Sequence, residues 1–252
     1  MKVHPGMEVA SLTDVGCQRE DNEDSYAYWE SPDDAIFARL GRLAVIADGM
    51  GGCEGGQFAS RIAVDSVQAS YTSAKDSSPQ ELLLDTVRLA NVRVQEKARL
   101  TPALRGMGTT LTAAAIVGNH LYFAHVGDSR LYLLRNGGLR ALTRDHTLVA
   151  RLVESGVIRP EDADSHPQKH VLTAAVGVGE DVVADAPDAG IPLEKDDVLL
   201  LCTDGLWGQM TDADIAGILS SSKPANAVQA LVQLAKDRGG PDNITLLVMR
   251  VN

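Results

Sequence analysis

Short runs of β-branched and other apolar residues recur along the chain and predict β-strands. The clearest runs cover residues 7–13, 43–47, 110–117, 120–126, 130–135, 198–203 and 243–251. The dipeptide Gly-Asn at 118–119 and the tripeptide Asn-Gly-Gly at 136–138 each separate two such runs, as turns do in β-hairpins. Much of the sheet structure is therefore expected to be antiparallel.

Apolar residues at helical spacing predict a second set of elements, at 55–69, 79–100, 147–155, 211–219 and 224–238. Pro79 and Pro224 suit the first turn of a helix, and Thr211 with Asp214 resembles a capping box. The two long helices must each bury an apolar stripe. Long helices beside antiparallel strands indicate an α+β fold in which a β-sandwich lies between helical layers.

The chain has 252 residues, which is enough for one large domain with its own core. We expect a single catalytic domain over residues 1–252. Residues 147–171 differ from the rest, because they combine little strand signal with mixed charge and two prolines, Pro160 and Pro167. This stretch is expected to form a small flap subdomain.

The net charge of −11 argues against binding to nucleic acid or to an anionic membrane, since both require a basic surface. The three cysteines Cys17, Cys53 and Cys202 form no CxxC pair, which favours buried thiols in a reducing compartment over a zinc cluster. The N-terminal residues lack a secretory apolar run, and no stretch approaches the ~18 apolar residues that span a bilayer. A cytoplasmic location is expected.

Several aspartates share one local context, in which a buried strand delivers a carboxylate to a glycine-containing turn. They are Asp48 before Gly-Met-Gly-Gly, Asp128 before Ser-Arg, Asp204 before Gly-Leu-Trp-Gly, and Asp242 within Gly-Gly-Pro-Asp-Asn. A lone aspartate at a turn means little, because aspartate is common there. If these side chains converge, however, their repulsion requires protons or a shared cation. Oxygen ligands favour Mg²⁺ or Mn²⁺ over zinc.

A second acidic group lies at residues 13–25, where Arg19 is the single basic residue among acids that include Glu23 and Asp24. One interpretation is a solvated acidic loop. In the other, Arg19 is a bidentate clamp for a phosphate group beside the metal ions.

The motifs, in their order along the chain, resemble the metal-dependent protein phosphatase family, type 2C, and its bacterial members. They are RxxxED (19–24), ADGMGG (47–52), GTT (108–110), GDSR (127–130), DH (145–146), TDGLW (203–207) and GGPDNIT (239–245). The resemblance extends from about Glu8 to Val251, and residues 146–177 resemble the flap of the bacterial members. It implies a central β-sandwich flanked by helices, with a two-metal site at one end.

The same resemblance implies residue roles. Asp48 is expected to bridge two Mn²⁺ or Mg²⁺ ions, with the carbonyl of Gly49 on one ion and Asp204 and Asp242 on the other. Glu23 and Asp24 are expected to act through water. Asp128, with Asp204, matches a possible third metal site, and Arg19 is expected to bind the substrate phosphate.

The implied reaction is hydrolysis of phosphoserine and phosphothreonine in proteins by a water that bridges the metals, in a monomer that opposes a Ser/Thr kinase. Met50 stands where animal members carry a histidine that can protonate the leaving group. A water on the metal, His166 or His170 are the open candidates for that step.

Three other readings remain. A cysteine phosphatase is disfavoured because the CxxxxxR motif is absent. A pseudoenzyme is disfavoured because it is expected to have lost ligand residues, and all of them are present here. A metallonuclease is disfavoured because the net charge is acidic.

Overall fold

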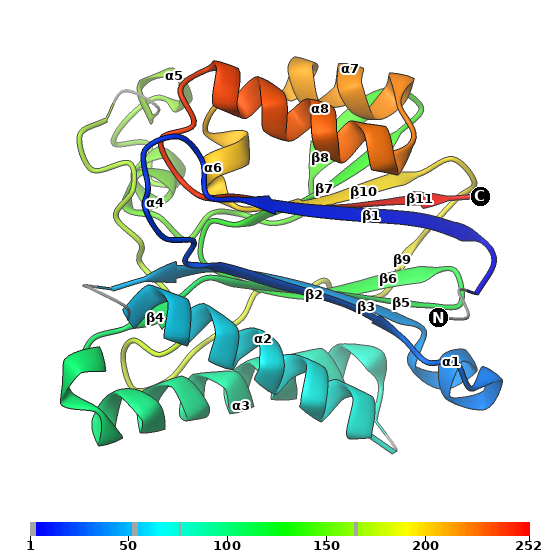
Figure 1. Cartoon of the computed structure of the whole chain (residues 1–252), viewed down its shortest axis with the longest axis horizontal. Coiled ribbons are helices and arrows are strands. Elements are labelled where there is room, and N and C mark those ends of the chain that lie inside the picture. The colour runs from blue at the N-terminus through cyan, green and yellow to red at the C-terminus, as the bar shows by residue number, and fades with distance from the viewer. Residues whose placement is uncertain (1–3, 52–54, 76, 164–165) are drawn as a thin grey trace.

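The computed structural model describes residues 4–51, 55–75, 77–163 and 166–252, and two antiparallel sheets pack face to face at its centre (Figure 1). The first sheet has the order β1 (Met7–Asp14), β11 (Ile244–Val251), β10 (Val198–Cys202), β7 (Arg130–Arg135) and β8 (Gly138–Ala141). The second has the order β2 (Asp24–Glu30), β3 (Arg42–Met50), β5 (Leu111–Val117), β6 (His120–Val126) and β9 (Ile191–Pro192), while β4 (Gly108–Thr109) pairs with the end of β3.

Helices cover the outer face of each sheet (Figure 1). On the second sheet lie α2 (Gly55–Ser73) and α3 (Pro79–Leu100), and on the first lie α7 (Asp212–Ser221) and α8 (Pro224–Asp237). The shorter helices are α1 (Asp34–Leu40), η1 (Pro102–Leu104), α4 (Leu148–Glu154), α5 (Pro160–Ala163) and α6 (Asp204–Trp207). This arrangement confirms the predicted α+β sandwich between helical layers.

The strands at the centre of each sheet are apolar throughout because both of their faces are buried. In β10, Leu199 and Leu201 point into the core between the sheets. Val198, Leu200 and Cys202 point the other way, into the core beneath α7 and α8. The alternation of side chains along a strand thus turns one apolar run into two separate packing surfaces.

Local turn and cap signals are confirmed. Val117 pairs with His120 and Arg135 pairs with Gly138, so each hairpin turn contains two residues. Asn136 and Gly137 have φ of 51° and 78°, as a type I′ turn requires. The side chain of Thr211 accepts a hydrogen bond from the Asp214 backbone and the reverse bond is also present, so the capping box exists.

The sequence pattern did not predict several elements, namely α1, β2, η1, β4, β8, α5, β9 and α6. The strand β2 is the outermost strand of its sheet and is only partly buried, so its apolar pattern is weak. The others are short. Among the described residues of 147–171 the structure has α4 and α5, and the single domain with a flap stays a prediction.

Parts of three predictions lie outside the described residues: Cys53, the last glycine of the ADGMGG motif, and positions 164–165 of the flap. In the described ranges, none of the helices has the length and apolar character needed to cross a membrane.

Candidate functional site

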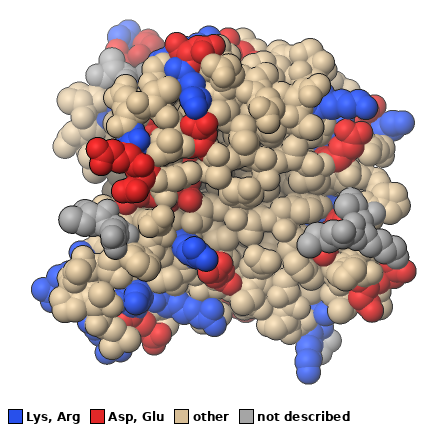
Figure 2. Space-filling model, in the orientation of Figure 1, with Lys and Arg blue, Asp and Glu red and all other residues tan. Residues whose placement is uncertain are grey.

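The predicted aspartates lie together at one end of the sandwich, on the left in Figure 1, where β2, β3, β10 and β11 begin or end. Asp24 on β2 lies directly opposite Asp48 on β3 in the sheet register. Asp204 follows β10, and Asp242 precedes β11, which is the neighbour of β10. Acidic side chains are visible at this end of the molecule, between the two helical layers (Figure 2).

The backbone of Asp48 is held by the threonines of the GTT motif. Its N–H donates to Thr110 Oγ1 at 2.8 Å, and its carbonyl accepts from Thr109 Oγ1 at 2.8 Å. Thr110 Oγ1 also bonds Ser129 Oγ at 2.7 Å, which links Asp48 to the loop that carries Asp128. The motifs GTT and GDSR therefore position the Asp48 side chain.

The carboxyl groups of this cluster have few protein partners. Asp24 Oδ2 accepts from Thr203 Oγ1 at 2.9 Å, whereas Asp24 Oδ1 and Asp204 Oδ1 are buried without a hydrogen-bond partner. The pKa of Asp204 is raised above its usual value, first by burial and then by the charge of Asp242. Buried oxygens without donors are costly, and a cation is the natural partner for them.

Burial and mutual repulsion raise the pKa values across the cluster. The pKa of Asp24 rises to about 7, first because of burial and then because of the charges of Asp204 and Asp242. The pKa of Asp128 rises to about 8 through burial and the charge of Asp204. The pKa of Asp48 lies well above its usual value for the same reasons. These groups cannot all be ionised at neutral pH without added positive charge.

These observations fit divalent cations, because the donor atoms are carboxylate oxygens, some lack partners, and their charges repel. Within the ranges the structure describes, no group of three or more His, Cys, Asp or Glu side chains already has the geometry of a metal-holding group. The residues fit the cation in chemistry and location, and their individual roles as ligands stay predictions.

Arg19 reaches the same place from the loop before β2. Its Nη2 donates to Asp242 Oδ2 at 2.7 Å, and half of its side chain is exposed. Asn243, which the sequence analysis did not single out, holds this loop: Oδ1 accepts from the Glu23 N–H, and Nδ2 donates to the carbonyl of Asp21. Its place in the GGPDN motif, directly after Asp242, is the feature of the sequence that could have identified Asn243.

Close backbone contacts explain two glycines. A Cβ on Gly16 would lie 2.2 Å from the carbonyl oxygen of Asp242, and Gly16 has φ of 82°. A Cβ on Gly49 would lie 2.1 Å from the carbonyl oxygen of Gly56. A Cβ on Gly56, in the first turn of α2, would lie 2.6 Å from the carboxylate oxygen Oε1 of Glu23. Strands and helix can approach this closely only because side chains are absent there.

A stacked pair supports Asp128 from the other side. Trp207 Nε1 donates to the Asp128 carbonyl at 3.0 Å, and the Arg130 guanidinium lies 3.5 Å above the Trp207 ring. Arg130 also makes two bonds to Asp145, at 2.9 and 2.7 Å. No role had been predicted for Arg130, Asp145 or Trp207, although all lie in recognised motifs.

The two flap histidines differ. His170 Nδ1 lies 3.9 Å from Asp204 Oδ2, and most of its side chain is exposed. His166 Nδ1 instead accepts the N–H of Gln168 in a local turn.

Asp14 belongs to the acidic stretch at residues 13–25, but its carboxylate forms an ion pair with Lys236 Nζ at 2.9 Å.

Comparisons with known proteins agree with this geometry. The family described as Protein phosphatase 2C matches residues 18–238. Protein phosphatase PhpP of Streptococcus pneumoniae is 35% identical over 252 residues, covering 98% of both chains. A serine/threonine phosphatase of S. agalactiae has a TM-score of 0.88 at 36% identity, covering 98% of this chain and 100% of that one. The catalytic domain of PstP in complex with two manganese ions has a TM-score of 0.84 at 34% identity, covering 98% of both.

Proposed function

Because the chain belongs to the protein phosphatase 2C family, we propose that it hydrolyses phosphoserine and phosphothreonine in proteins with the help of bound Mn²⁺ or Mg²⁺. The observation that carries the proposal is the partly buried carboxyl cluster of Asp24, Asp48 and Asp204, which has buried oxygens without partners beside the half-exposed Arg19. Such a cluster is costly unless cations occupy it, and a phosphate dianion needs the same cations.

The residues divide the work between holding cations and holding substrate. Asp48, Asp204 and Asp242 would hold two ions together with the Gly49 carbonyl, Glu23 and Asp24 would act through water, and Asp128 would help to hold a third. When bound, such ions supply Lewis acidity and lower the pKa of a coordinated water.

Arg19 would bind the phosphoryl oxygens. Its guanidinium uses one N–H group on Asp242 and keeps others for a planar, bidentate contact with phosphate. Asp242 thereby also orients the guanidinium. Developing negative charge on the phosphoryl oxygens would then meet a positioned cation.

The leaving alkoxide needs a proton. The separation of 3.9 Å between His170 Nδ1 and Asp204 Oδ2 supports His170 over His166 for this role, because His166 uses its ring nitrogen within the flap. A general acid must be within hydrogen-bond reach of the leaving oxygen, directly or through one water.

A phosphate-release assay tests the proposal. Purified protein with Mn²⁺ should release phosphate from phosphothreonine peptides, EDTA should stop the reaction, and Asp48→Asn should abolish it. The matched control Asp65→Asn changes an exposed aspartate on α2 and should retain activity. Full activity of the Asp48→Asn variant, or turnover that EDTA leaves unchanged, would refute the proposal.

The natural partners follow from the same proposal. Substrates are phosphorylated proteins, and a Ser/Thr kinase would supply them. A monomer in the cytoplasm without nucleic-acid or membrane partners stays a prediction, supported by the net charge of −11.

A further inference from the structure

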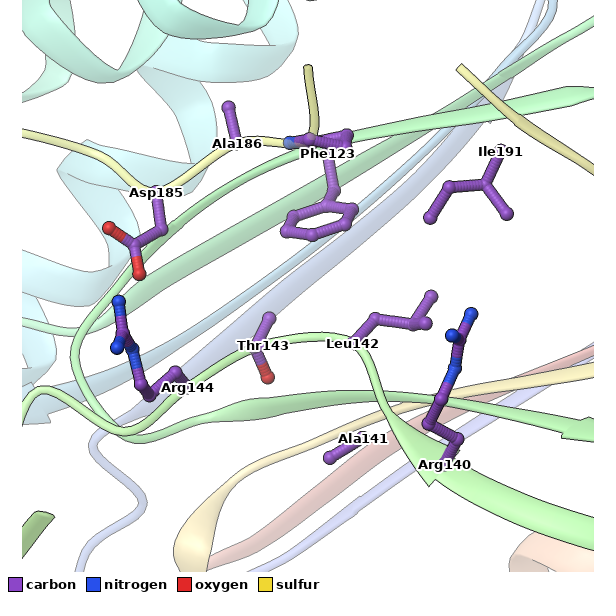
Figure 3. Close-up of a pocket in the computed structure, with 10 residues that line it drawn as sticks. Phe123, Arg140, Ala141, Leu142, Thr143, Arg144, Asp185, Ala186 and Ile191 are labelled. Atoms are coloured by element: carbon purple, nitrogen blue, oxygen red, sulfur yellow. The ribbon is translucent and has the colours of Figure 1, made fainter. Parts of the chain in front are cut away.

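A pocket of about 290 Å³ opens at the side of the sandwich, where β6 and β9 of one sheet meet the segment that follows β8 of the other (Figure 3). Phe123 and Leu142 approach each other across it, and Ile191 lies at one side. The side chains of Arg140 and Arg144 lie toward opposite ends (Figure 3). None of these residues belongs to the carboxyl cluster, so this is a second site.

The apolar lining is an exposed margin of the core between the sheets. Phe123 is part of that core, and Leu142 and Ile191 pack against it while remaining partly exposed. An aliphatic side chain from another molecule could therefore continue the native packing, which is the driving force for burial in such a pocket.

The charged groups at the pocket favour an anionic partner. The exposed Arg140 guanidinium has no hydrogen bond or ion pair within the part of the chain that the structure describes. Arg144 Nη1 bonds Glu154 Oε1 at 2.7 Å, but both side chains are largely exposed, so the pair is weak. The carboxylate of Asp185 is engaged by His146 Nε2 at 3.2 Å.

The shape of the surface favours an extended peptide. β8 is the last strand of its sheet, and its residues continue into the pocket lining from Arg140 to Arg144. A second hollow of about 420 Å³ lies along the same hairpin and shares Arg140. An extended peptide commonly binds along the edge strand of a sheet, where its alternate side chains enter pockets beside that strand.

We propose that this pocket is a docking site for an acidic segment of the substrate phosphoprotein, remote from the phosphorylated residue. An aliphatic side chain of that segment lies against Phe123 and Leu142, and carboxylates on either side of it pair with Arg140 and Arg144. The inference rests on the proposed phosphatase function. Docking raises the effective concentration of the phosphorylated residue at the metal site, so it lowers KM and leaves kcat unchanged.

Two synthetic substrates test this. Both carry a phosphothreonine sequence joined by a Gly-Ser linker to a docking segment, which is Glu-Asp-Leu-Asp-Glu in one and Gln-Asn-Leu-Asn-Gln in the other. We expect the acidic substrate to have a several-fold lower KM at equal kcat, and the difference to shrink as salt is added. Equal KM values, or a KM difference that grows with salt, would overturn the docking site.

Variants locate the effect. R140E should remove the KM advantage of the acidic substrate and leave hydrolysis of para-nitrophenyl phosphate unchanged. R88E changes an exposed arginine on α3, outside the pocket, and should keep the KM advantage of the acidic substrate. A substrate with Lys in place of the acids should bind R140E better than wild type, which also shows that the variant is folded. An unchanged KM ratio in R140E would overturn the assignment of this pocket.

The same peptides separate failure of this inference from failure of the proposed function. Hydrolysis of para-nitrophenyl phosphate and of the neutral substrate tests the phosphatase alone. If neither is hydrolysed, fluorescence polarisation of the labelled, unphosphorylated acidic segment still tests docking. Binding that R140E weakens and R88E retains supports the site, and no binding to the wild type overturns it.

Discussion

Asp24→Asn should stabilise the metal-free protein, and the gain should grow with pH. Asp24 is partly buried opposite Asp48 and accepts one hydrogen bond from Thr203, while its buried Oδ1 has no partner. Its pKa is raised to about 7, first by burial and then by the charges of neighbouring aspartates. The amide of asparagine has nearly the same shape but carries no charge, so it removes the repulsion and can still accept from Thr203.

The magnitude follows from linkage. A rise of the pKa from 3.8 to about 7 corresponds to roughly 4 kcal/mol, at about 1.4 kcal/mol per pKa unit. The folded state holds this proton more tightly than the unfolded state, so the free energy of unfolding falls as pH rises from 3.8 to about 7. Relative to wild type in EDTA, the D24N variant should be more stable by roughly 2 kcal/mol at pH 5 and roughly 4 kcal/mol at pH 8.

Urea denaturation in EDTA at pH values from 5 to 8 measures this difference. D65N, at an exposed position on α2, serves as the control and should change stability by less than about 0.5 kcal/mol at every pH. Saturating Mn²⁺ should reduce the advantage of the variant, because cations offset the repulsion in the wild type. A difference between D24N and wild type that stays flat or falls with pH would refute the account of the cluster.

Three further predictions concern the same end of the molecule. Mn²⁺ should raise the melting temperature of the wild type and EDTA should reverse the rise, and a melting temperature indifferent to metal contradicts a cation site. Gly49→Ala places a Cβ 2.1 Å from a backbone oxygen of α2 and should lower the free energy of unfolding by more than about 2 kcal/mol. Gly217→Ala, on α7, has open space around the new Cβ and should be neutral or stabilising, and equal denaturation midpoints for the two variants would contradict the close contact at Gly49. Trp207→Phe keeps a ring under Arg130 but loses the bond to the Asp128 carbonyl, so it should cost about 1 kcal/mol and weaken the most weakly bound Mn²⁺ in calorimetry. Trp29→Phe, which changes a tryptophan on β2, should leave the Mn²⁺ titration unchanged, and identical titrations for Trp207→Phe and wild type would contradict a role of Trp207 at the metal site.

The sequence predicted the fold well wherever burial alone determines the pattern. Both faces of β10 are covered, so its residues form an apolar run that needs no knowledge of neighbours. The end of β3 was harder. The predicted strand stopped at Ala47, but pairing with β2 and β4 continues the strand to Met50, so Asp48 lies within the strand. Backbone pairing with distant segments leaves no mark in the local hydrophobic pattern.

The acidic residues of the site could be predicted from the sequence, but the residues that hold them in position could not. Aspartates beside glycine-containing turns at the ends of apolar runs gave Asp48, Asp204 and Asp242 as a group, since the ends of neighbouring strands meet at one end of a sandwich. The contact of Trp207 with the Asp128 carbonyl joins residues far apart in the chain. Contacts of this kind depend on how the sheets and loops pack, and single-residue patterns carry no such information.

The order of strands in the first sheet has a consequence for synthesis of the protein. β11 follows all the other strands of the two sheets along the chain, and it lies between β1 and β10. Until residues 242–251 have left the ribosome, β1 has no strand to pair with, and Arg19 has no Asp242 to bind. The second sheet can assemble earlier, because its strands lie between Asp24 and Pro192. Before β11 is made, the chain therefore has the second sheet and the strands β10, β7 and β8 of the first, but no complete anionic pocket, so phosphatase activity can begin only once β11 has been synthesised.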